Sequence, residues 1–252
     1  MGARCFLYSP CTARCGKLKA YKEREGKAMR RWTRGRLFAW ILVFVLAAVF
    51  EVAATGAVEE YQVSDFDRQV VAEVNRARAN PGEYARILLD TRPLYEGKRI
   101  RLGPRQFLIT QEGVAALDEA VAYLRQAPAL PPLEFSTGLS LASGELVADQ
   151  GVSGKTGHAG SDGGQVWDRA NRHGRWLLCV GENIAYGART PQDVVAKLLV
   201  DDGVPGRGHR ANIFSDQFKV LGVAHGKHPG FGVMCVMAFA GGFEEPRPAP
   251  QQ

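Results

Sequence analysis

Residues 177–186 read LLCVGENIAY, a short apolar run with the polar pair Glu182 and Asn183 at its centre. A run of this length and hydrophobicity is typical of a buried strand. Residues 219–225 and residues 232–240 form two similar runs, and the second of these alternates apolar side chains on one face. Together the three runs predict a small antiparallel sheet in the C-terminal half of the chain, joined as a meander.

Helical patterns precede and interrupt these strands. The clearest begins at Ser64, a residue suited to cap a helix, and ends near Asn80, because the proline that follows disfavours helix before it. Further helices are predicted over residues 84–89, 113–126, 136–150, 166–172 and 191–200, whereas residues 91–110 look irregular, with weak strand character at 106–110. Several helices around a sheet, without alternation of strand and helix, predict an α+β domain.

Three short islands place an imidazole or an acid beside a glycine. They are Gly157-His158, Gly181-Glu182 and Gly208-His209. Imidazoles and carboxylates hold divalent metals or pass protons near neutral pH, so folding can assemble the three into one site. Two neutral imidazoles and a carboxylate can bind zinc with a water at the open position. Two other interpretations stay open. Glu182 can orient an imidazole by a hydrogen bond without binding the metal itself, or the three residues form a hydrogen-bonded polar core.

The order of these islands, after residues 75–82 (NRARANPG) on the first helix, resembles the CAP superfamily of SCP-like extracellular domains, in its bacterial branch. The resemblance covers residues 64–243. It implies a three-layer α-β-α sandwich with a small antiparallel sheet between helices. It also implies a cleft with two histidines and two acids, which in some members binds zinc or another divalent cation. His158 and His209 match the two histidines, and Glu182 matches the acid of the Gly-Glu-Asn motif.

The second acid is where this chain departs from the family pattern. Members often carry a segment with tryptophan and glutamate before the second histidine, but residues 198–203 here read LLVDDG. Asp202 or its neighbour Asp201 is expected to take the place of the glutamate, with a shorter side chain. The implied cleft comprises His158, Glu182, His209 and Asp202, and the implied metal ligands are His158, His209 and Glu182.

These residues favour binding over catalysis. An exported CAP-like protein is expected to bind a divalent cation, a lipid or a glycan-peptide of the cell envelope in its cleft. The alternative is a metal-assisted hydrolase that acts on an envelope or peptide substrate, with Glu182 as base for a water held between the imidazoles. A third interpretation is an envelope protein with an inert polar cluster. No serine or cysteine stands beside the islands as an activated nucleophile, so the enzyme is the less favoured class.

Two cysteines, Cys179 and Cys235, fall in the predicted domain, on the first and the last predicted strand. A disulfide needs their Cα atoms within about 7 Å, and strand order decides whether this is met. A disulfide and two buried thiols are the alternatives, and the thiols are favoured because Cys235 alternates with apolar neighbours. His225 and His228, close to a Pro-Gly turn, are expected to be exposed.

The N-terminal residues are expected to direct export rather than to join the fold. Residues 1–28 look like a translated leader, with Met29 as the true start. Residues 29–57 combine a basic start, an apolar run and a small-residue end, as in a signal peptide, or in a signal anchor if cleavage does not occur. The predicted domain spans residues 58–243, and residues 244–252 form a proline-rich tail. The protein is expected to be secreted, periplasmic or held at the cell envelope, with membrane contact only through an uncleaved signal.

Net charge argues against nucleic acid as a partner. The chain carries +6 overall, but residues 1–36 hold 11 Lys and Arg against 2 acids, a sum of +9. Residues 58–252 hold 21 basic and 23 acidic side chains, which leaves −2. A nucleic-acid surface needs a basic domain, and this domain is slightly acidic.

Overall fold

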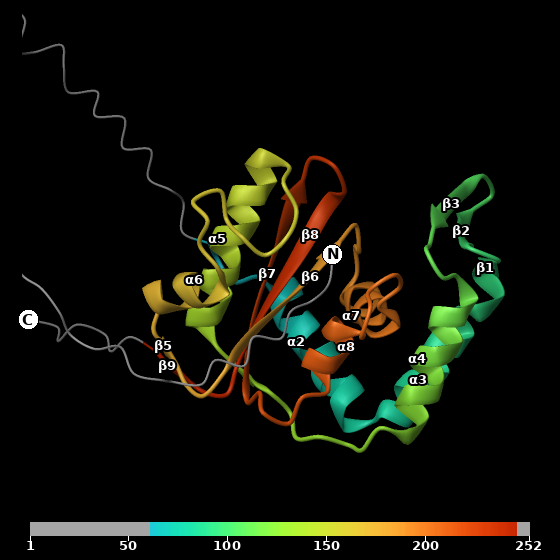
Figure 1. The fold of residues 1–252 in the computed structure, drawn as a ribbon, viewed down its shortest axis with the longest axis horizontal. Coiled ribbons are helices and arrows are strands. Elements are labelled where there is room, and N and C mark those ends of the chain that lie inside the picture. The colour runs from blue at the N-terminus through green and yellow to red at the C-terminus, as the bar shows by residue number, and fades with distance from the viewer. Residues whose placement is uncertain (1–60, 246–252) are drawn as a thin grey trace, which may run out of the picture. The chain divides into compact units, whose positions relative to one another are not determined.

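The computed structural model describes residues 61–245, which place a four-stranded sheet between two layers of helices (Figure 1). The strand order of this sheet is β4-β7-β8-β6. Its strands are β4 (Glu134–Phe135), β6 (Val180–Tyr186), β7 (Val220–His228) and β8 (Gly232–Ala240). Because successive side chains of a strand point to opposite faces, each face contributes apolar residues to one helical layer. The predicted α+β sandwich is confirmed.

One layer consists of α5 (Thr137–Ser153) and α6 (Val166–Arg172). Its residues Leu139 and Val166 pack with Val180 and Ala238 of the sheet. Helix α5 comes very close to β7 at Gly222, where an added Cβ would lie 2.2 Å from the backbone nitrogen of Ser140. Glycine is therefore required there by the approach of two backbones.

The opposite layer contains the remaining helices. They are α2 (Asp65–Ala79), α3 (Pro81–Asp90), α4 (Val114–Gln126), α7 (Pro191–Val200) and α8 (Gly208–Ile213). Their buried side chains form the larger core together with Val223, Met237 and Phe239 of the sheet. Figure 1 shows α2, α7 and α8 on one side of the sheet and α5 and α6 on the other.

Strand β8 lies between β6 and β7, so the predicted meander is wrong in its strand order. β6 pairs antiparallel with β8, from Val180 opposite Ala240 to Tyr186 opposite Met234. β7 pairs with the other side of β8, and β4 adds a short parallel pairing to β7. Because α7 and α8 separate β6 from β7, the two strands need not be neighbours, and the short connection from β7 to β8 places β8 between them. β6 is left as an edge strand of this sheet.

The start of α2 is tied to the sheet by a buried carboxylate. Ser64 caps the helix as predicted, and Asp67 accepts a hydrogen bond from the Ser64 backbone nitrogen at 2.7 Å. Asp67, fully buried, also accepts a hydrogen bond from the Tyr61 hydroxyl at 2.6 Å and contacts His225 Nδ1 at 2.9 Å. The exposed turn predicted for His225 and His228 is wrong, because β7 continues to His228, which is 2% exposed.

Two further segments differ from the sequence predictions. Pro81 begins α3 directly after α2, because proline suits the first position of a helix. The stretch expected to be irregular forms a short helix and a separate three-stranded sheet: η1 (Arg92–Leu94), β1 (Tyr95–Glu96), β2 (Arg99–Gly103) and β3 (Gln106–Ile109).

The C-terminal end of the domain reaches into the predicted tail. β9 (Phe243–Glu244) pairs with β5 (Arg175–Trp176), and Arg175 forms an ion pair with Glu244 at 2.7 Å. The predicted leader, signal segment and domain start at residue 58 lie outside the described residues, as does the end of the tail. Among the helices of residues 61–245, none is long and apolar enough to cross a membrane.

Candidate functional site

The first histidine pair joins His158 to Glu182. β6 buries Glu182 with its side chain toward the α5–α6 layer, and the loop after α5 brings His158 to it. His158 Nδ1 lies 2.8 Å from Glu182 Oε1, and the side chain of Glu182 is only 3% exposed. These two residues, predicted to share a site although they are 24 positions apart in the sequence, are in direct contact.

Arg169 of α6 completes this pair and was not predicted. One of its guanidinium nitrogens (Nη2) lies 2.5 Å from Glu182 Oε2, and both side chains are 3% exposed. The other (Nη1) donates to the backbone oxygens of His158 and Gly164. Arg169 therefore supplies the opposite charge that a buried carboxylate requires. The available signal was an arginine beside Ala170 and three residues after Val166, on the inward face of a predicted helix.

The loop that carries His158 is held at a second point. Gly157 donates its backbone N–H to the Tyr186 hydroxyl at 3.0 Å, and its carbonyl accepts from Gln150 Nε2 at 2.6 Å. The Tyr186 hydroxyl in turn donates to Gln150 Oε1 at 2.8 Å. Gln150 is fully buried, and burial raises the pKa of Tyr186, so both side chains stay neutral hydrogen-bonding groups. His158 is thus positioned by contacts on both sides of its peptide unit.

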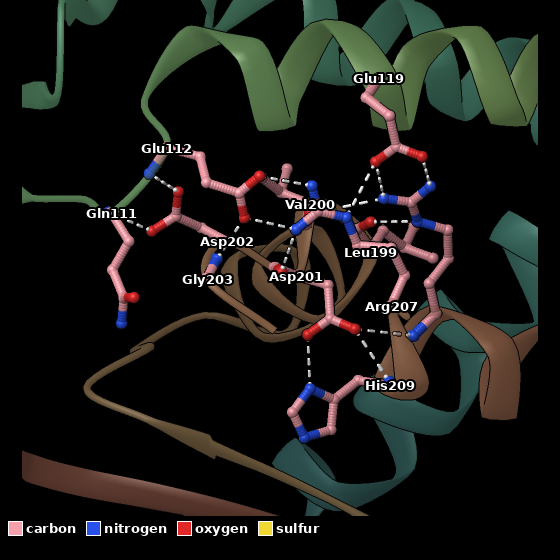
Figure 2. A network of polar contacts seen from close by, with 11 residues as sticks. Gln111, Glu112, Glu119, Leu199, Val200, Asp201, Asp202, Gly203, Arg207 and His209 are labelled. Atoms are coloured by element: carbon pink, nitrogen blue, oxygen red, sulfur yellow. Dashed lines mark hydrogen bonds and ion pairs between the residues drawn. The ribbon is translucent and has the colours of Figure 1, made fainter. Parts of the chain in front are cut away.

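The second pair joins His209 to Asp201, not to Asp202 (Figure 2). His209 Nδ1 lies 2.5 Å from Asp201 Oδ1, and the backbone nitrogen of His209 donates to Asp201 Oδ2 at 2.9 Å. The predicted cleft residue Asp202 is corrected to Asp201. The reason is that the chain turns at the end of α7 and sends Asp202 the other way, where its carboxylate accepts from the backbone nitrogens of Gln111 and Glu112.

Ion pairs hold the loop that carries this pair against α4 and the turn before α4 (Figure 2). Arg207 binds Glu112 through two nitrogens, at 2.6 and 2.7 Å, and these contacts, followed by the Gly203 N–H, lower the pKa of Glu112 to about 2. Arg210, 2% exposed, binds both oxygens of Glu119 and the backbone oxygen of Leu199. α8 is therefore anchored by arginines on either side of His209.

Both pairs contact β6, an edge strand of the sheet, one from each side of this strand. Glu182 points to the α5–α6 layer, whereas Asn183, the next residue, donates to the backbone oxygen of His209 at 2.9 Å. Asn212 of α8 donates to Asn183 Oδ1 at 2.8 Å and to the Glu182 backbone oxygen. Two successive residues of one edge strand thus hold one pair each.

The predicted three-ligand metal centre does not fit this arrangement. Within residues 61–245 no group of three His, Cys, Asp or Glu side chains is placed to hold a metal ion. Glu182 cannot join His158 and His209 as a ligand, because its oxygens already face His158 and Arg169. What the site offers instead is one ring nitrogen from each histidine. Nδ1 faces a buried carboxylate, while Nε2 has no hydrogen-bond partner among the described residues.

The two cysteines of the domain are buried, and no disulfide joins them within residues 61–245. Gly241 donates its backbone N–H to Cys179, so Cys179 lies beside the end of β8, six positions along the chain from Cys235. At about 3.3 Å per residue the two lie about 20 Å apart, too far for a disulfide. Cys235 is instead a core residue, and burial raises the pKa of its thiol.

Comparison with known proteins gives a family match and two distant structural similarities. No curated protein matches the chain. An extracellular protein containing a SCP domain from Bacillus anthracis str. Ames shares 22% identity over 48% of this chain and 37% of that one, with a TM-score of 0.37. An outer surface protein from Borrelia burgdorferi shares 19% identity over 44% of this chain and 78% of that one, with a TM-score of 0.38.

The family match covers the segment that builds both histidine pairs. Residues 119–239 match the model of the cysteine-rich secretory protein family, CAP. This range begins in α4 and ends in β8, so it includes His158, Glu182 and His209. This part of the chain is therefore similar to the CAP family.

Proposed function

We propose that this chain is an exported, non-catalytic binding protein of the cell envelope, and that the Nε2 atoms of His158 and His209 meet its ligand. The observation that carries the proposal is the pairing of each Nδ1 with a carboxylate that is almost fully buried. A carboxylate on Nδ1 fixes the ring orientation and the tautomer, so that Nε2 presents its lone pair outward. This is the arrangement by which proteins prepare histidines for a cation or a hydrogen-bond donor.

Export and envelope location rest on the sequence before the domain and on the family. Residues 29–57 have the composition of an export signal. The matched family is described as secretory. A slightly acidic domain with buried thiols needs no disulfide to be stable in such a compartment.

The hydrolase alternative is not favoured by the contacts of Glu182. A general base must reach a water in front of the substrate, and both oxygens of Glu182 are held by His158 and Arg169. We therefore propose orientation of His158 as the role of Glu182.

A titration of the full chain with Zn2+ tests the proposal, because a neutral imidazole nitrogen is a good zinc ligand. With 15N-histidine labelling, Nε2 of His158 and of His209 is expected to shift on binding, while His173 does not. His158→Ala and His209→Ala should each lower Zn2+ affinity at least about tenfold, the scale of a lost ligand or orienting contact. His173→Ala, which removes a histidine paired with Glu145 outside the site, is the matched control and should leave affinity unchanged.

The outcomes separate three cases. A loss of Zn2+ affinity in both His158→Ala and His209→Ala supports one shared site. Loss in only one variant would mean that the two pairs act separately, which contradicts the shared ligand. If neither Nε2 responds to Zn2+ or to other divalent cations, a cation is excluded as the ligand, and the polar cluster is structural.

A further inference from the structure

Large exposed hydrophobic side chains gather on one small part of this domain. Nine large hydrophobic residues are exposed among the described residues, and five of these nine fall between residues 94 and 109. The five are Leu94 at 42%, Leu102 at 63%, Phe107 at 39%, Leu108 at 44% and Ile109 at 71% exposed. The other four are scattered over distant segments. Single exposed apolar residues are common on proteins, but a cluster indicates an interaction site.

The same segment is strongly basic in an acidic domain. Residues 95–109 contain Lys98, Arg99, Arg101 and Arg105 against Glu96, which sums to +3. Residues 58–252 sum to −2, so the remainder of that range carries −5. Lys98 and Arg105 form no ion pair with described residues. Opposite charges are thus separated between this segment and the rest of the domain.

The strand register puts the basic and apolar side chains on one face. Arg99 pairs with Ile109, and Arg101 pairs with Phe107, across β2 and β3. Residues paired in this way point to the same side of a sheet. The Arg99 guanidinium lies 5.0 Å from the centre of the Phe107 ring, and both arginine side chains are at least half exposed. We call these four residues, with Lys98 and Arg105 in the adjoining turns, the hairpin face.

The hairpin face is held away from the main sheet. Figure 1 shows β1, β2 and β3 beyond the ends of α3 and α4, on the side opposite to α5 and α6. Glu96 is the one acid within the segment, and it lies 3.2 Å from Arg101 and 3.8 Å from Arg99 without cancelling their joint charge. The three-stranded sheet thus lies apart from the main sheet and from α5 and α6 (Figure 1).

We propose that the hairpin face docks on an anionic lipid bilayer surface. Anionic headgroups attract basic side chains, and the boundary below them accepts aromatic and aliphatic groups such as Phe107 and Ile109. A second copy of the chain is a poorer occupant, because it would place arginine against arginine. An acidic protein would satisfy the charges but not the exposed apolar side chains. This proposal does not depend on the ligand of the histidine pairs.

Hydrogen–deuterium exchange of the full chain, with and without vesicles, tests the proposal at the level of single segments. A site-resolved readout is needed because residues 29–57 are also expected to bind lipid. Vesicles of phosphatidylcholine with about 30% phosphatidylglycerol have an anionic surface. These vesicles should protect the amides of β2 and β3 from exchange. Vesicles of phosphatidylcholine alone should not.

Variants make the expected effect quantitative. Each basic side chain near an anionic surface contributes about fivefold to partitioning. Arg99→Ser with Arg101→Ser should therefore raise the lipid concentration for half-maximal protection about 25-fold. Arg99→Lys with Arg101→Lys should keep protection. Arg125→Ser with Arg189→Ser removes two exposed arginines elsewhere and is the matched control. A Phe107→Ser, Ile109→Ser pair tests the apolar part, and thermal unfolding verifies that each variant is folded.

Three results would overturn the proposal. Equal protection by neutral vesicles would show apolar adsorption without charge recognition. Protection of β2 and β3 that needs no lipid and grows with protein concentration would identify a second copy as the occupant. Unchanged exchange in β2 and β3 at saturating anionic lipid would exclude the bilayer as a partner of this face.

Discussion

The two site histidines differ in their acid partners but share one geometry. In each, Nδ1 is close to a carboxylate that is 2–3% exposed, at 2.5 Å for His209 and 2.8 Å for His158. Zn2+ competes with protons for an imidazole nitrogen, so Zn2+ affinity should fall as pH is lowered. Isothermal titration at neutral and at mildly acidic pH measures this. Affinity that stays constant over this range would exclude imidazole ligands.

Asp201 and Asp202 can be told apart by one pair of variants. Asp201→Asn should release His209 and cost about 1.5–3 kcal/mol of stability, because a buried hydrogen bond to a charged group is lost. Asp202→Asn leaves the His209 contacts intact and should not change the Nδ1 resonance of His209. Chemical denaturation and histidine NMR provide the two measurements. An Asp202 variant with the larger effect on His209 would contradict the assignment.

Asp67 links stability to pH in a predictable direction. Burial alone would raise its pKa, but hydrogen bonds from His225, Tyr61 and Ser64 outweigh burial and lower the pKa. A carboxyl with a lowered pKa stabilises the fold above its unfolded value, about 3.9, and this contribution is lost as pH falls through the folded value. Asp67→Asn should cost about 1.5–3 kcal/mol at pH 7.

Below about pH 4 the difference between wild type and Asp67→Asn should shrink, because the unfolded wild type then takes up a proton that folded Asp67 takes up only at lower pH. Denaturation midpoints of both proteins from pH 7 to pH 3 provide the measurement (about one unit beyond the unfolded value). A difference that stays constant into acid would show that the charge of Asp67 contributes nothing.

At the residue scale, the sequence indicated both histidines and Glu182, because glycine-flanked polar residues stand out in apolar segments. It did not identify Arg169, because its position in the predicted helix suggests an inward side chain but does not show which acid it pairs with. The choice between Asp201 and Asp202 depends on the direction in which the chain leaves α7. That direction is a backbone property, which two adjacent aspartates do not reveal.

Elements in this fold depend on close backbone contacts that side-chain patterns do not show. Gly222→Ala in β7 would place a Cβ 2.2 Å from the backbone of α5. Overpacking of this kind should destabilise by about 1–3 kcal/mol or more. Gly82→Ala is the matched control, because a Cβ added at this position of α3 would meet nothing within 4 Å. Urea unfolding of both variants tests the difference, and equal losses would contradict it.

The helices were the most predictable elements, because caps and apolar stripes are local signals. α4 and α6 were predicted within one residue of their observed bounds, and β8 matched in full. The order of the strands was not predictable in this way, since the pairing of β6 with β8 joins residues from Tyr186 and Met234, 48 positions apart, to Val180 and Ala240, 60 positions apart. β2 was missed, and β3 was indicated only as weak strand character at residues 106–110, because the apolar side chains of β3 are exposed and form no core pattern.

For the whole molecule, the prediction concerns export. If residues 29–57 are a cleaved signal, the mature protein should begin between residues 55 and 58 and be found outside the cytoplasm. Cleavage after residue 57 removes residues 1–57 and so changes the net charge from +6 for the full sequence to −2 for residues 58–252. N-terminal sequencing and isoelectric focusing of protein from its native compartment measure both. An intact Met1 on a cytoplasmic protein would contradict export.

Asp201 ends α7 in a left-handed conformation, with φ at 54° and ψ at 41°. Among residues with side chains, aspartate and asparagine adopt this conformation most readily, and longer side chains are disfavoured. The residue that orients His209 is therefore also the residue that stops the helix. A glutamate at this place would have to strain the backbone or shift the end of α7. One extra helical residue would turn the acid by about 100° around the helix axis. The length of α7 thus selects which acid this site can use.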